Sequence, residues 1–303
     1  PNLGTIKKIS EINHNNINSN NFLILTTKKK YVLRIFSDQS PPIKTEKICE
    51  ILNYCKKKGI KVSSPILNKN KKYVDPLKRI YLTNYEEGGK FNGNRDQLKD
   101  LAKNLALLHK CLSTNKINYN YRTNQKFYKI LDLNEFKIII KKIDKKKNLD
   151  SVDKKIMKNF EILKKSIEEN STAFQNVKNK FKQKQLIHHD LHPDNVIFNN
   201  NKLQAIIDFN SMRKGFVIQD ISFAFFRFIN ISKLKDIRKE KIIFIQTYIK
   251  YNKIEIDEEL VDEFFKYEIL KRLSFIIRKK YFHNSVRWIK DFEKNIVYLK
   301  NIQ

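Results

Sequence analysis

The side chains in this sequence best suited to chemistry are Asp190, Asn195 and Asp208, each of which lies next to an apolar run typical of a strand. Phosphoryl transfer asks little covalent chemistry of a protein, because its transition state resembles metaphosphate. The reaction needs one carboxylate that orients the attacking hydroxyl and two oxygen ligands that hold Mg²⁺ on the nucleotide. Asp190 would orient the hydroxyl, and Asn195 and Asp208 would hold the metal.

The sequence between these residues predicts how they come together. Pro193 prevents a regular helix in the segment before Asn195, so loop side chains can point into one cleft. Residues 196–198 and 203–209 have the composition of two short strands around a polar turn. A hairpin of this kind brings Asp208 back beside Asn195 and would form the metal site.

An isolated Asp-x-x-x-x-Asn is common, and a lone His-x-Asp belongs more often to a capped turn than to a catalyst. Here residues 188–195 read His-His-Asp-Leu-His-Pro-Asp-Asn, and residues 207–209 read Ile-Asp-Phe. Together they resemble the motifs of the aminoglycoside phosphotransferase, choline kinase and homoserine kinase superfamily. The resemblance implies that Asp190 is the catalytic aspartate and that Asn195 and Asp208 are the first and second magnesium ligands.

Other residues around the motif take supporting roles in this resemblance. His188 is expected to pack beneath the loop, and Asp220 to buttress it through backbone hydrogen bonds. His192 lies two residues after Asp190, where protein kinases have a lysine that contacts phosphate. We hypothesise that His192 assists the transferred phosphoryl group; the alternative is that it packs under Pro193.

The superfamily resemblance also implies a fold, a two-lobed protein-kinase-like α+β architecture. We expect residues 1–86 to form a small, nucleotide-covering N-lobe with an antiparallel sheet. Residues 87–303 would form a larger, mainly helical C-lobe, with a helical insertion around 131–182 that shapes the substrate side.

Two runs predict a hairpin that covers the nucleotide, residues 21–26 and 31–36. In related kinases the second strand carries a cation that grips the phosphates, which makes Arg34 the candidate, with a planar fork suited to bidentate contact. Arg34 as an ordinary solvated strand residue is the alternative. The preceding segment 12–21 lies where related kinases have a glycine-rich phosphate loop, but it contains no glycine. Its Asn-x-Asn at 18–20 resembles the homoserine kinase branch. A polar loop without ligand contacts is the alternative to a phosphate-covering turn.

The predicted strand at 80–84 runs into a glycine-rich bend that resembles the hinge between kinase lobes. We assign Asn84, Tyr85 and Glu86 to adenine binding through backbone groups, and a simple hairpin exit is the alternative. A helix is predicted over 45–58.

The acids of this predicted N-lobe helix bear on Arg34. Glu46 and Glu50 fall outside the apolar stripe of the helix, which puts the usual ion pair between Arg34 and a glutamate in doubt.

Later helices are predicted from apolar periodicity at 97–112, 221–228, 241–251, 257–282 and 286–301. The acidic run 255–263 has two interpretations. Carboxylates at a helix start complement the helix dipole, whereas a wall of acids would accept an amine-bearing substrate.

Composition limits the remaining classes. With 303 residues, of which 41% are hydrophobic, the chain can bury a substantial core. Its net charge of +30 comes from lysines spread along the chain rather than gathered with aromatics, so no specific nucleic-acid partner is expected. Three cysteines without metal-like spacing, no signal segment and no long apolar run together predict a cytoplasmic protein without a membrane span.

The sequence therefore predicts an ATP- and Mg²⁺-dependent kinase that acts on the hydroxyl of a small molecule. Homoserine-like acceptors are favoured; amine-bearing choline, ethanolamine and aminoglycosides stay open. A noncatalytic nucleotide-binding protein is the alternative from another class, although all three key side chains are present. Only eleven residues separate Asp208 from Asp220, too few for the activation segment of a protein kinase.

Overall fold

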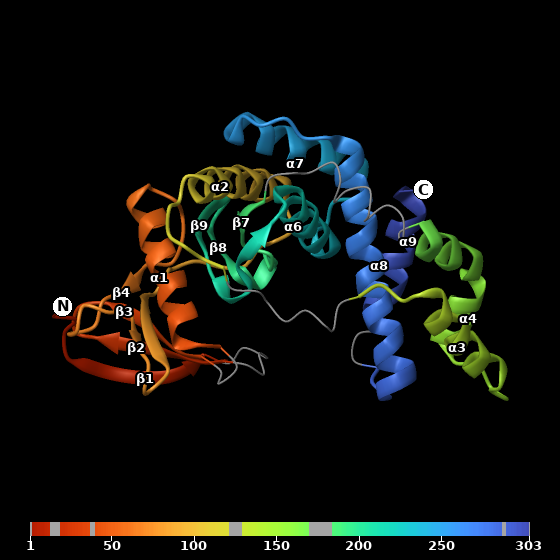
Figure 1. Cartoon of the computed structure of the whole chain (residues 1–303), viewed down its shortest axis with the longest axis horizontal. Coiled ribbons are helices and arrows are strands. Elements are labelled where there is room, and N and C mark those ends of the chain that lie inside the picture. Colours follow the sequence, from red (N-terminus) through yellow and green to blue (C-terminus); the bar gives the residue numbers. More distant parts are fainter. Residues whose placement is uncertain are drawn as a thin grey trace.

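The computed structural model describes residues 2–12, 19–36, 40–120, 129–169, 184–286 and 289–302. A twisted sheet with one helix forms one end of the molecule, and helices dominate the rest (Figure 1). This arrangement confirms the expected two-lobed α+β fold. The lobe boundary between residues 86 and 87 stays a prediction.

The N-lobe sheet is antiparallel and has the strand order β1-β2-β3-β6-β4, with β5 also paired to β6. Its strands are β1 (Ile6–Ile12), β2 (Ser19–Thr26), β3 (Lys30–Phe36), β4 (Pro65–Ile66), β5 (Val74–Asp75) and β6 (Ile80–Asn84). The β2–β3 hairpin confirms the predicted pair of strands, and its register places Asn21 opposite Arg34. Residues 13–18, which hold most of the predicted phosphate loop, lie outside the described residues.

One N-lobe helix, α1 (Pro42–Lys57), packs on this sheet. It begins three residues earlier than predicted, because Pro42 at the first helical position has no N–H to leave unpaired. Its apolar stripe is buried as expected, and Cys55 on that stripe lies with its Sγ 3.8 Å from the Sγ of Cys111. All three cysteines are free and buried.

Two backbone bridges join the catalytic hairpin, which consists of β8 (Val196–Asn199) and β9 (Lys202–Ile206), to the N-lobe and to the hinge segment that follows it. Gly89 exchanges hydrogen bonds with Phe198, at 2.7 and 2.8 Å, and Val62 lies beside Ile206 in a parallel bridge. Gly88 has a φ of +152°, and a Cβ there would lie 2.4 Å from the Phe198 carbonyl oxygen. The close approach of the hinge to the hairpin therefore requires glycine at this position.

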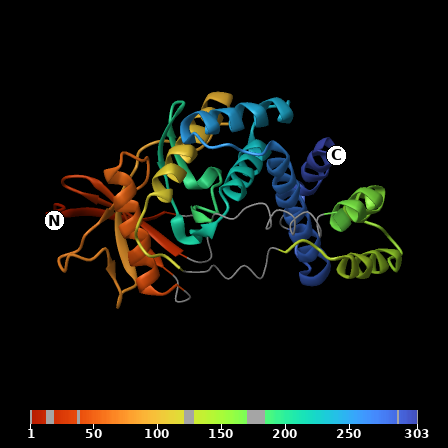
Figure 2. The same ribbon diagram turned by 45° about the horizontal axis from the view of Figure 1, so that its top comes forward.

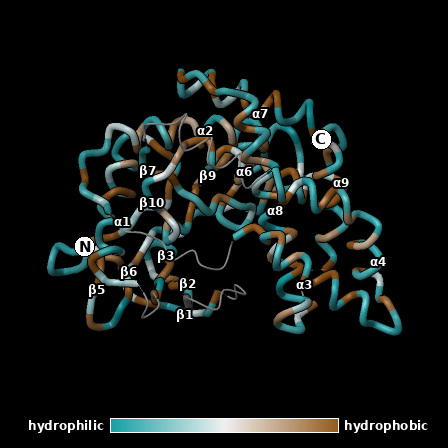
Figure 3. Tube along the Cα trace, turned by 45° about the vertical axis from the view of Figure 1, so that its right-hand side comes forward, coloured by the Kyte–Doolittle hydropathy of each residue, from teal (hydrophilic) through white to brown (hydrophobic). Residues whose placement is uncertain are grey.

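Helices surround the catalytic hairpin and a second strand pair, β7 (Gln185–Ile187) with β10 (Arg213–Gly215) (Figure 2). They are α2 (Arg95–Ser113), α6 (Val217–Ile231) and α7 (Ile237–Asn252). All three extend beyond their predicted ranges but contain them. Hydrophobic and hydrophilic positions alternate along these helices, as expected where each buries one face in the common core (Figure 3).

The far end of the molecule is built from α3 (Leu133–Asp144), α4 (Ser151–Lys158), α8 (Glu258–His283) and α9 (Lys290–Ile302), with a further helical stretch at 160–169. Most described residues of the segment 131–182 are thus helical, and its role as an insertion that shapes the substrate side stays a prediction. Among the described residues, no helix is long and apolar enough to cross a membrane.

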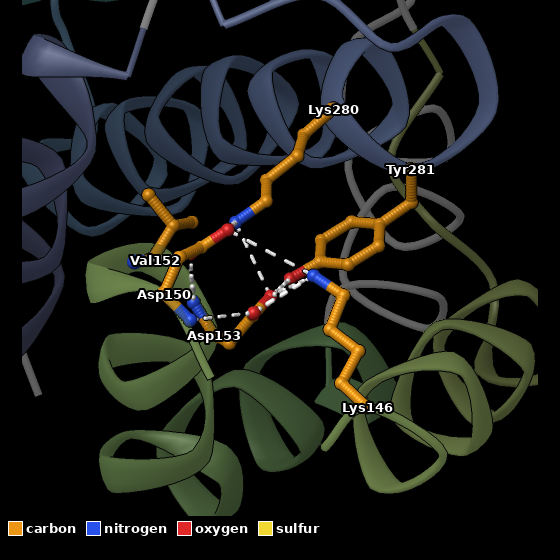
Figure 4. A network of polar contacts seen from close by, with 6 residues as sticks. All are labelled: Lys146, Asp150, Val152, Asp153, Lys280 and Tyr281. Carbon is orange, nitrogen blue, oxygen red and sulfur yellow. Dashed lines mark hydrogen bonds and ion pairs between the residues drawn. The ribbon is translucent and has the colours of Figure 1, made fainter. Parts of the chain in front are cut away.

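A polar network joins the insertion to α8 (Figure 4). Asp153 of α4, fully buried, accepts hydrogen bonds from Lys146 at 2.7 and 2.9 Å and from the Tyr281 hydroxyl. Lys280 of α8 lies 3.2 Å from Asp153 and donates to Asp150, which caps α4. The network fixes the position of the insertion relative to α8.

Candidate active site

A cavity of about 430 Å³ lies between the N-lobe sheet and the catalytic hairpin. Its lining includes every predicted site residue except Asp190, namely Arg34, Asn84, Tyr85, Glu86, His192, Asn195 and Asp208. Val32 contributes an apolar surface from the N-lobe, and Ile197 and Ile207 do so from the C-lobe. The cavity therefore offers two apolar walls with polar groups gathered at the catalytic loop.

Asn195 and Asp208 approach each other because the hairpin register pairs Val196 with Ile206. The ladder continues one step further, where the Ile207 N–H donates to the Asn195 carbonyl at 2.9 Å. Asp208 then leaves the strand with a φ of +61°, which turns its side chain into the cavity lining.

The amide orientation of Asn195 suits a metal ligand. Its Nδ2 donates to the Asp190 carbonyl at 2.8 Å, and its Oδ1 takes part in no hydrogen bond recorded among the described residues. A hard cation such as Mg²⁺ prefers carboxylate and amide oxygens and keeps several waters or phosphate oxygens as further ligands. The pair Asn195 and Asp208 fits this requirement. The described residues contain no group of three or more His, Cys, Asp or Glu side chains that could hold a metal by themselves.

Asp190 does not line the cavity itself, and 41% of its side chain is exposed. Burial by the surrounding loop and the neighbouring charge of Asp208 raise the pKa of Asp190 to about 7. A cation at Asp208 would offset part of the second effect, because a bound metal is the largest local charge in such a site. Asp190 is thus placed as a group that can take up a proton near neutral pH.

The catalytic loop is fixed by the fully buried Asp220 at the start of α6. Its carboxylate accepts from the N–H of His188 at 2.7 Å and from the N–H of His189 at 2.6 Å. The ring of His188 accepts from the Asp190 N–H at 3.2 Å, so its Nε2 donates to the Ile207 carbonyl at 3.0 Å. These bonds agree with the supporting roles expected for Asp220 and His188.

A buried chain beyond Asp220 was missed from the sequence. His109 of α2 contacts Asp220 at 3.0 Å and the Tyr248 hydroxyl at 2.7 Å, and Asn252 donates to that hydroxyl. Burial opposes ionisation of Asp220, but the hydrogen bond and charge of His109 outweigh it, so the pKa of Asp220 is lowered. A histidine and an asparagine on otherwise apolar helix faces were the available sequence signals.

His192 lies between the loop and the cavity. Its Nδ1 accepts from the Asp194 N–H at 3.3 Å, and its Nε2 lies 3.9 Å from Asp190 Oδ2. Burial, followed by the charge of Arg227, lowers the pKa of His192 to about 4, so the ring is neutral at neutral pH. This geometry leaves an Nε2–H near Asp190, and the role in phosphoryl transfer stays a prediction.

Arg34 lines the cavity from β3, opposite Tyr81 of β6. It forms no ion pair with any described residue, because Glu46 accepts from the Tyr73 and Val74 N–H groups and Glu50 pairs with Lys47. The doubt about a usual cation–glutamate pair is thus supported for the described part of the chain. Contact of Arg34 with nucleotide phosphates stays a prediction.

The predicted hinge residues line the cavity in sequence. The N–H groups of Asn84 and Tyr85 donate to the carbonyls of Ser64 and Lys30, at 2.9 and 3.2 Å. No hydrogen bond of the Glu86 peptide group is recorded among the described residues, and its carboxylate lies 4.0 Å from Lys56. The peptide of Glu86 is therefore without a recorded partner among the described residues, and adenine binding by the hinge stays a prediction.

The acidic run 255–263 is partly accounted for by local structure. Asp257 caps α8 by accepting from Glu259 and Leu260 at 3.1 and 3.3 Å, and Asp262 pairs with Lys241 of α7. Asp257 thus serves the helix start, as in the helix-dipole interpretation, whereas Asp262 is engaged by a lysine of another helix. A contact of the run with an amine-bearing substrate stays a prediction.

Comparisons with known proteins agree with this geometry. Residues 8–238 match the model of the phosphotransferase enzyme family, which is more than half of the chain. No curated protein sequence matches.

Among solved structures, an aminoglycoside phosphotransferase from Alicyclobacillus acidocaldarius is 14% identical with a TM-score of 0.72, covering 97% of this chain and 91% of that one. A spectinomycin phosphotransferase bound to ADP and spectinomycin is 15% identical with a TM-score of 0.66, covering 97% and 92%. A choline kinase from Streptococcus pneumoniae is 15% identical with a TM-score of 0.58, covering 98% and 94%. At these identities the structures show the fold, and the family match over residues 8–238 shows that this chain belongs to the phosphotransferase enzyme family.

Proposed function

We propose that this protein is an ATP- and Mg²⁺-dependent kinase that transfers the γ-phosphoryl group to a hydroxyl of a small molecule. The observation that carries the proposal is the joining of Asp190 to Asn195 by the 2.8 Å hydrogen bond, with Asp208 beside them on a cavity that the hinge also lines. Structures of similar fold that hold ADP, or an ATP analogue, support a nucleotide in this cavity. We further propose that the lobes meet at the hinge, near residues 86 and 87.

In this mechanism the nucleotide base lies between the apolar walls at Val32 and Ile197, against the hinge. Arg34 contacts the phosphates. Asn195 and Asp208 would hold Mg²⁺, which neutralises charge on the phosphate oxygens when bound.

Asp190 orients the acceptor hydroxyl toward the γ-phosphorus and takes its proton. A bond forms between the hydroxyl oxygen and phosphorus, the bond from phosphorus to the bridging oxygen of ADP breaks, and ADP leaves with that electron pair. Neutral His192, with Nε2 3.9 Å from Asp190, is placed to donate a hydrogen bond to the moving phosphoryl group.

The favoured acceptors are homoserine-like compounds or other amino alcohols. Aminoglycosides, choline and ethanolamine are the alternatives, because structures of similar fold include kinases named for these substrates. A noncatalytic nucleotide-binding protein is the alternative from another class.

The test is ATP consumption with Mg²⁺ across homoserine, choline, ethanolamine, sugars and aminoglycosides. Asp190→Asn should lower acceptor-dependent turnover by roughly 10²- to 10⁴-fold, the range for loss of a positioned acid–base group. The matched control is Asp144→Asn, an exposed aspartate at the end of α3, which should leave turnover unchanged. Nucleotide binding without turnover on any acceptor would favour the noncatalytic alternative.

A further inference from the structure

Asp190 does not line the nucleotide cavity, and the side chains grouped beside its neighbour His189 come from α6 and α8. Ring contacts connect the loop that carries Asp190 to these two helices. His189, which precedes Asp190, stacks its ring on Phe223 of α6, with 6.3 Å between centroids and 12° between planes. The ammonium of Lys271 on α8 lies 5.5 Å from the centre of the same Phe223 ring. None of these three residues lines the nucleotide cavity.

Arg227 completes this cluster one helical turn after Phe223, with its guanidinium carbon 5.9 Å from the ring centre. Among the described residues, no hydrogen bond or ion pair of its side chain is recorded, although the charges of Arg272, Asp190, Asp291 and Glu268 act on it. Burial lowers the pKa of Arg227, and the nearby Asp190 opposes that effect. A partly buried guanidinium without a paired carboxylate is costly, because it has lost water without gaining an anion.

Two neighbouring cations, Lys271 and Arg272, are already paired with acids, which sets Arg227 apart from them. Lys271 pairs with Glu268 on the same helix, and Arg272 contacts Asp291 of α9 at 2.5 Å. Arg213 contacts His189, whose own pKa is lowered to about 3 by burial and by the charge of Arg213, so that ring is neutral. The acceptor side of Asp190 is therefore rich in cations, and the two acids within it, Glu268 and Asp291, are occupied.

We infer that the acceptor carries a carboxylate beside its hydroxyl and that Arg227, flanked by Lys271, binds that carboxylate while Asp190 engages the hydroxyl. The planar fork of arginine matches a carboxylate in bidentate geometry. One unpaired guanidinium balances a single negative charge, which suits a carboxylate better than a doubly charged phosphate ester. A permanently cationic acceptor would instead meet repulsion here. The inference rests on the proposed kinase function and narrows its acceptors to hydroxy acids.

The experiment uses acceptor pairs that differ only by the carboxylate: homoserine against 3-amino-1-propanol, and serine against ethanolamine. For the wild type we expect kcat/KM to favour the carboxylate-bearing member of a pair. Arg227→Gln should remove that preference, lowering kcat/KM for the acid by roughly 10- to 100-fold, the range for a lost charge-assisted hydrogen bond. The KM for ATP and the turnover of the carboxylate-free member should stay within about twofold. Arg238→Gln, an exposed arginine of α7, is the matched control.

A purely electrostatic effect of Arg227 on Asp190 would overturn the inference, and it has its own signature. It would shift the pH profile for both members of each pair equally and leave their ratio unchanged. A wild type that prefers ethanolamine, choline or aminoglycosides over every acid would also overturn it, while leaving the kinase function intact.

Absence of turnover with all acceptors would instead remove the proposed function. Calorimetric binding of homoserine with a nonhydrolysable ATP analogue then still decides the point: binding that needs both the carboxylate and Arg227 supports the inference, and its absence overturns it. The thermal midpoints of Arg227→Gln and Arg238→Gln, measured alongside, identify a folding defect. If Arg227→Gln has one, Lys271→Gln serves as the second variant, and we expect it to reduce the preference for the carboxylate-bearing acceptor by a smaller factor.

Discussion

Two aspartates, Asp220 at the catalytic loop and Asp153 in the insertion, have fully buried carboxylates that are satisfied in different ways. Asp220 accepts from two peptide N–H groups and from His109. Asp153 accepts from one peptide N–H, that of Asp150, but mainly from side chains: Lys146 and the Tyr281 hydroxyl, with Lys280 close by (Figure 4). Peptide donors fix the path of the backbone, whereas long cationic side chains fasten one helix to another. The first arrangement is suited to positioning chemistry and the second to holding the insertion in place.

The largest effect should come from Asp220→Asn, measured as turnover. An amide can present only one acceptor oxygen, so one of the N–H groups of His188 and His189 faces an N–H donor instead. The loop that carries Asp190 then shifts, and a displacement of about 1 Å costs on the order of 10²-fold in rate. Turnover under saturating ATP and acceptor is the measurement. An unchanged kcat in folded protein would mean that Asp220 does not position the loop.

Asp153→Asn should act on stability instead. Removing one partner from a buried ion pair typically costs about 3–5 kcal/mol, and Lys146 and Lys280 would each lose a buried partner. We expect a lower free energy of unfolding by urea titration, with kcat nearly unchanged in the folded fraction. Asp144→Asn provides the control. A large fall in kcat without a fall in stability would show that the insertion takes part in turnover directly.

Low pH should weaken the polar network of Asp153 that joins the insertion to α8. Burial opposes ionisation of Asp153, but hydrogen bonds from Lys146 and Tyr281 outweigh it, and its pKa is lowered well below the ordinary value. A carboxylate with a depressed folded pKa contributes stability that is complete above its unfolded pKa, near 3.9, and that is lost as the pH falls below it. The free energy of unfolding should be measured between about pH 6 and about pH 3, a range that spans the reference pKa of aspartate. Over this range it should decline less steeply in Asp153→Asn than in the wild type. Parallel curves would contradict this contribution.

Added salt should have the smallest effect on stability, and it should distinguish the insertion network from the buried chain at Asp220. Asp150 is 53% exposed where it meets Lys280, so this contact is open to screening by ions. Its loss in high salt should lower stability by less than about 1 kcal/mol, the usual size of an exposed pair. Asp150→Asn should abolish that part of the salt dependence, whereas variants of the His109 and Tyr248 chain should retain it. Equal salt dependence in all of these variants would mean that the screened charges lie elsewhere.

The nucleotide side of the molecule was predictable because its signals are local. The hairpin that joins Asn195 to Asp208 is short and follows strand alternation around a polar turn, and the β2–β3 pair is just as local. Strand β1 was missed because its sequence, Ile-Lys-Lys-Ile-Ser-Glu-Ile, forms an edge whose side chains are mostly exposed, so no apolar alternation marks it.

The acceptor side was not predictable because it is assembled from distant segments. Phe223 of α6 contacts both Arg227 of the same helix and Lys271 of α8, more than forty residues along the chain, and only the packing of these two helices brings Lys271 there. The single arginine within the apolar run 221–228 was the available sign. The apolar run predicts a buried helix, but only the three-dimensional structure shows that this arginine has no paired carboxylate among the described residues.

The backbone bridges that hold the catalytic hairpin to the hinge and to the N-lobe affect how this sequence can evolve. Gly89 and Phe198 are joined through peptide groups alone, and so are the segments at Val62 and Ile206. Peptide bonding does not depend on side-chain identity, so most of these positions can change while the two lobes keep their registration. Gly88 is the exception, since any side chain there meets the Phe198 carbonyl. A saturation library across both bridges should show broad tolerance with one intolerant site, which is how a shared architecture persists at 14–15% identity.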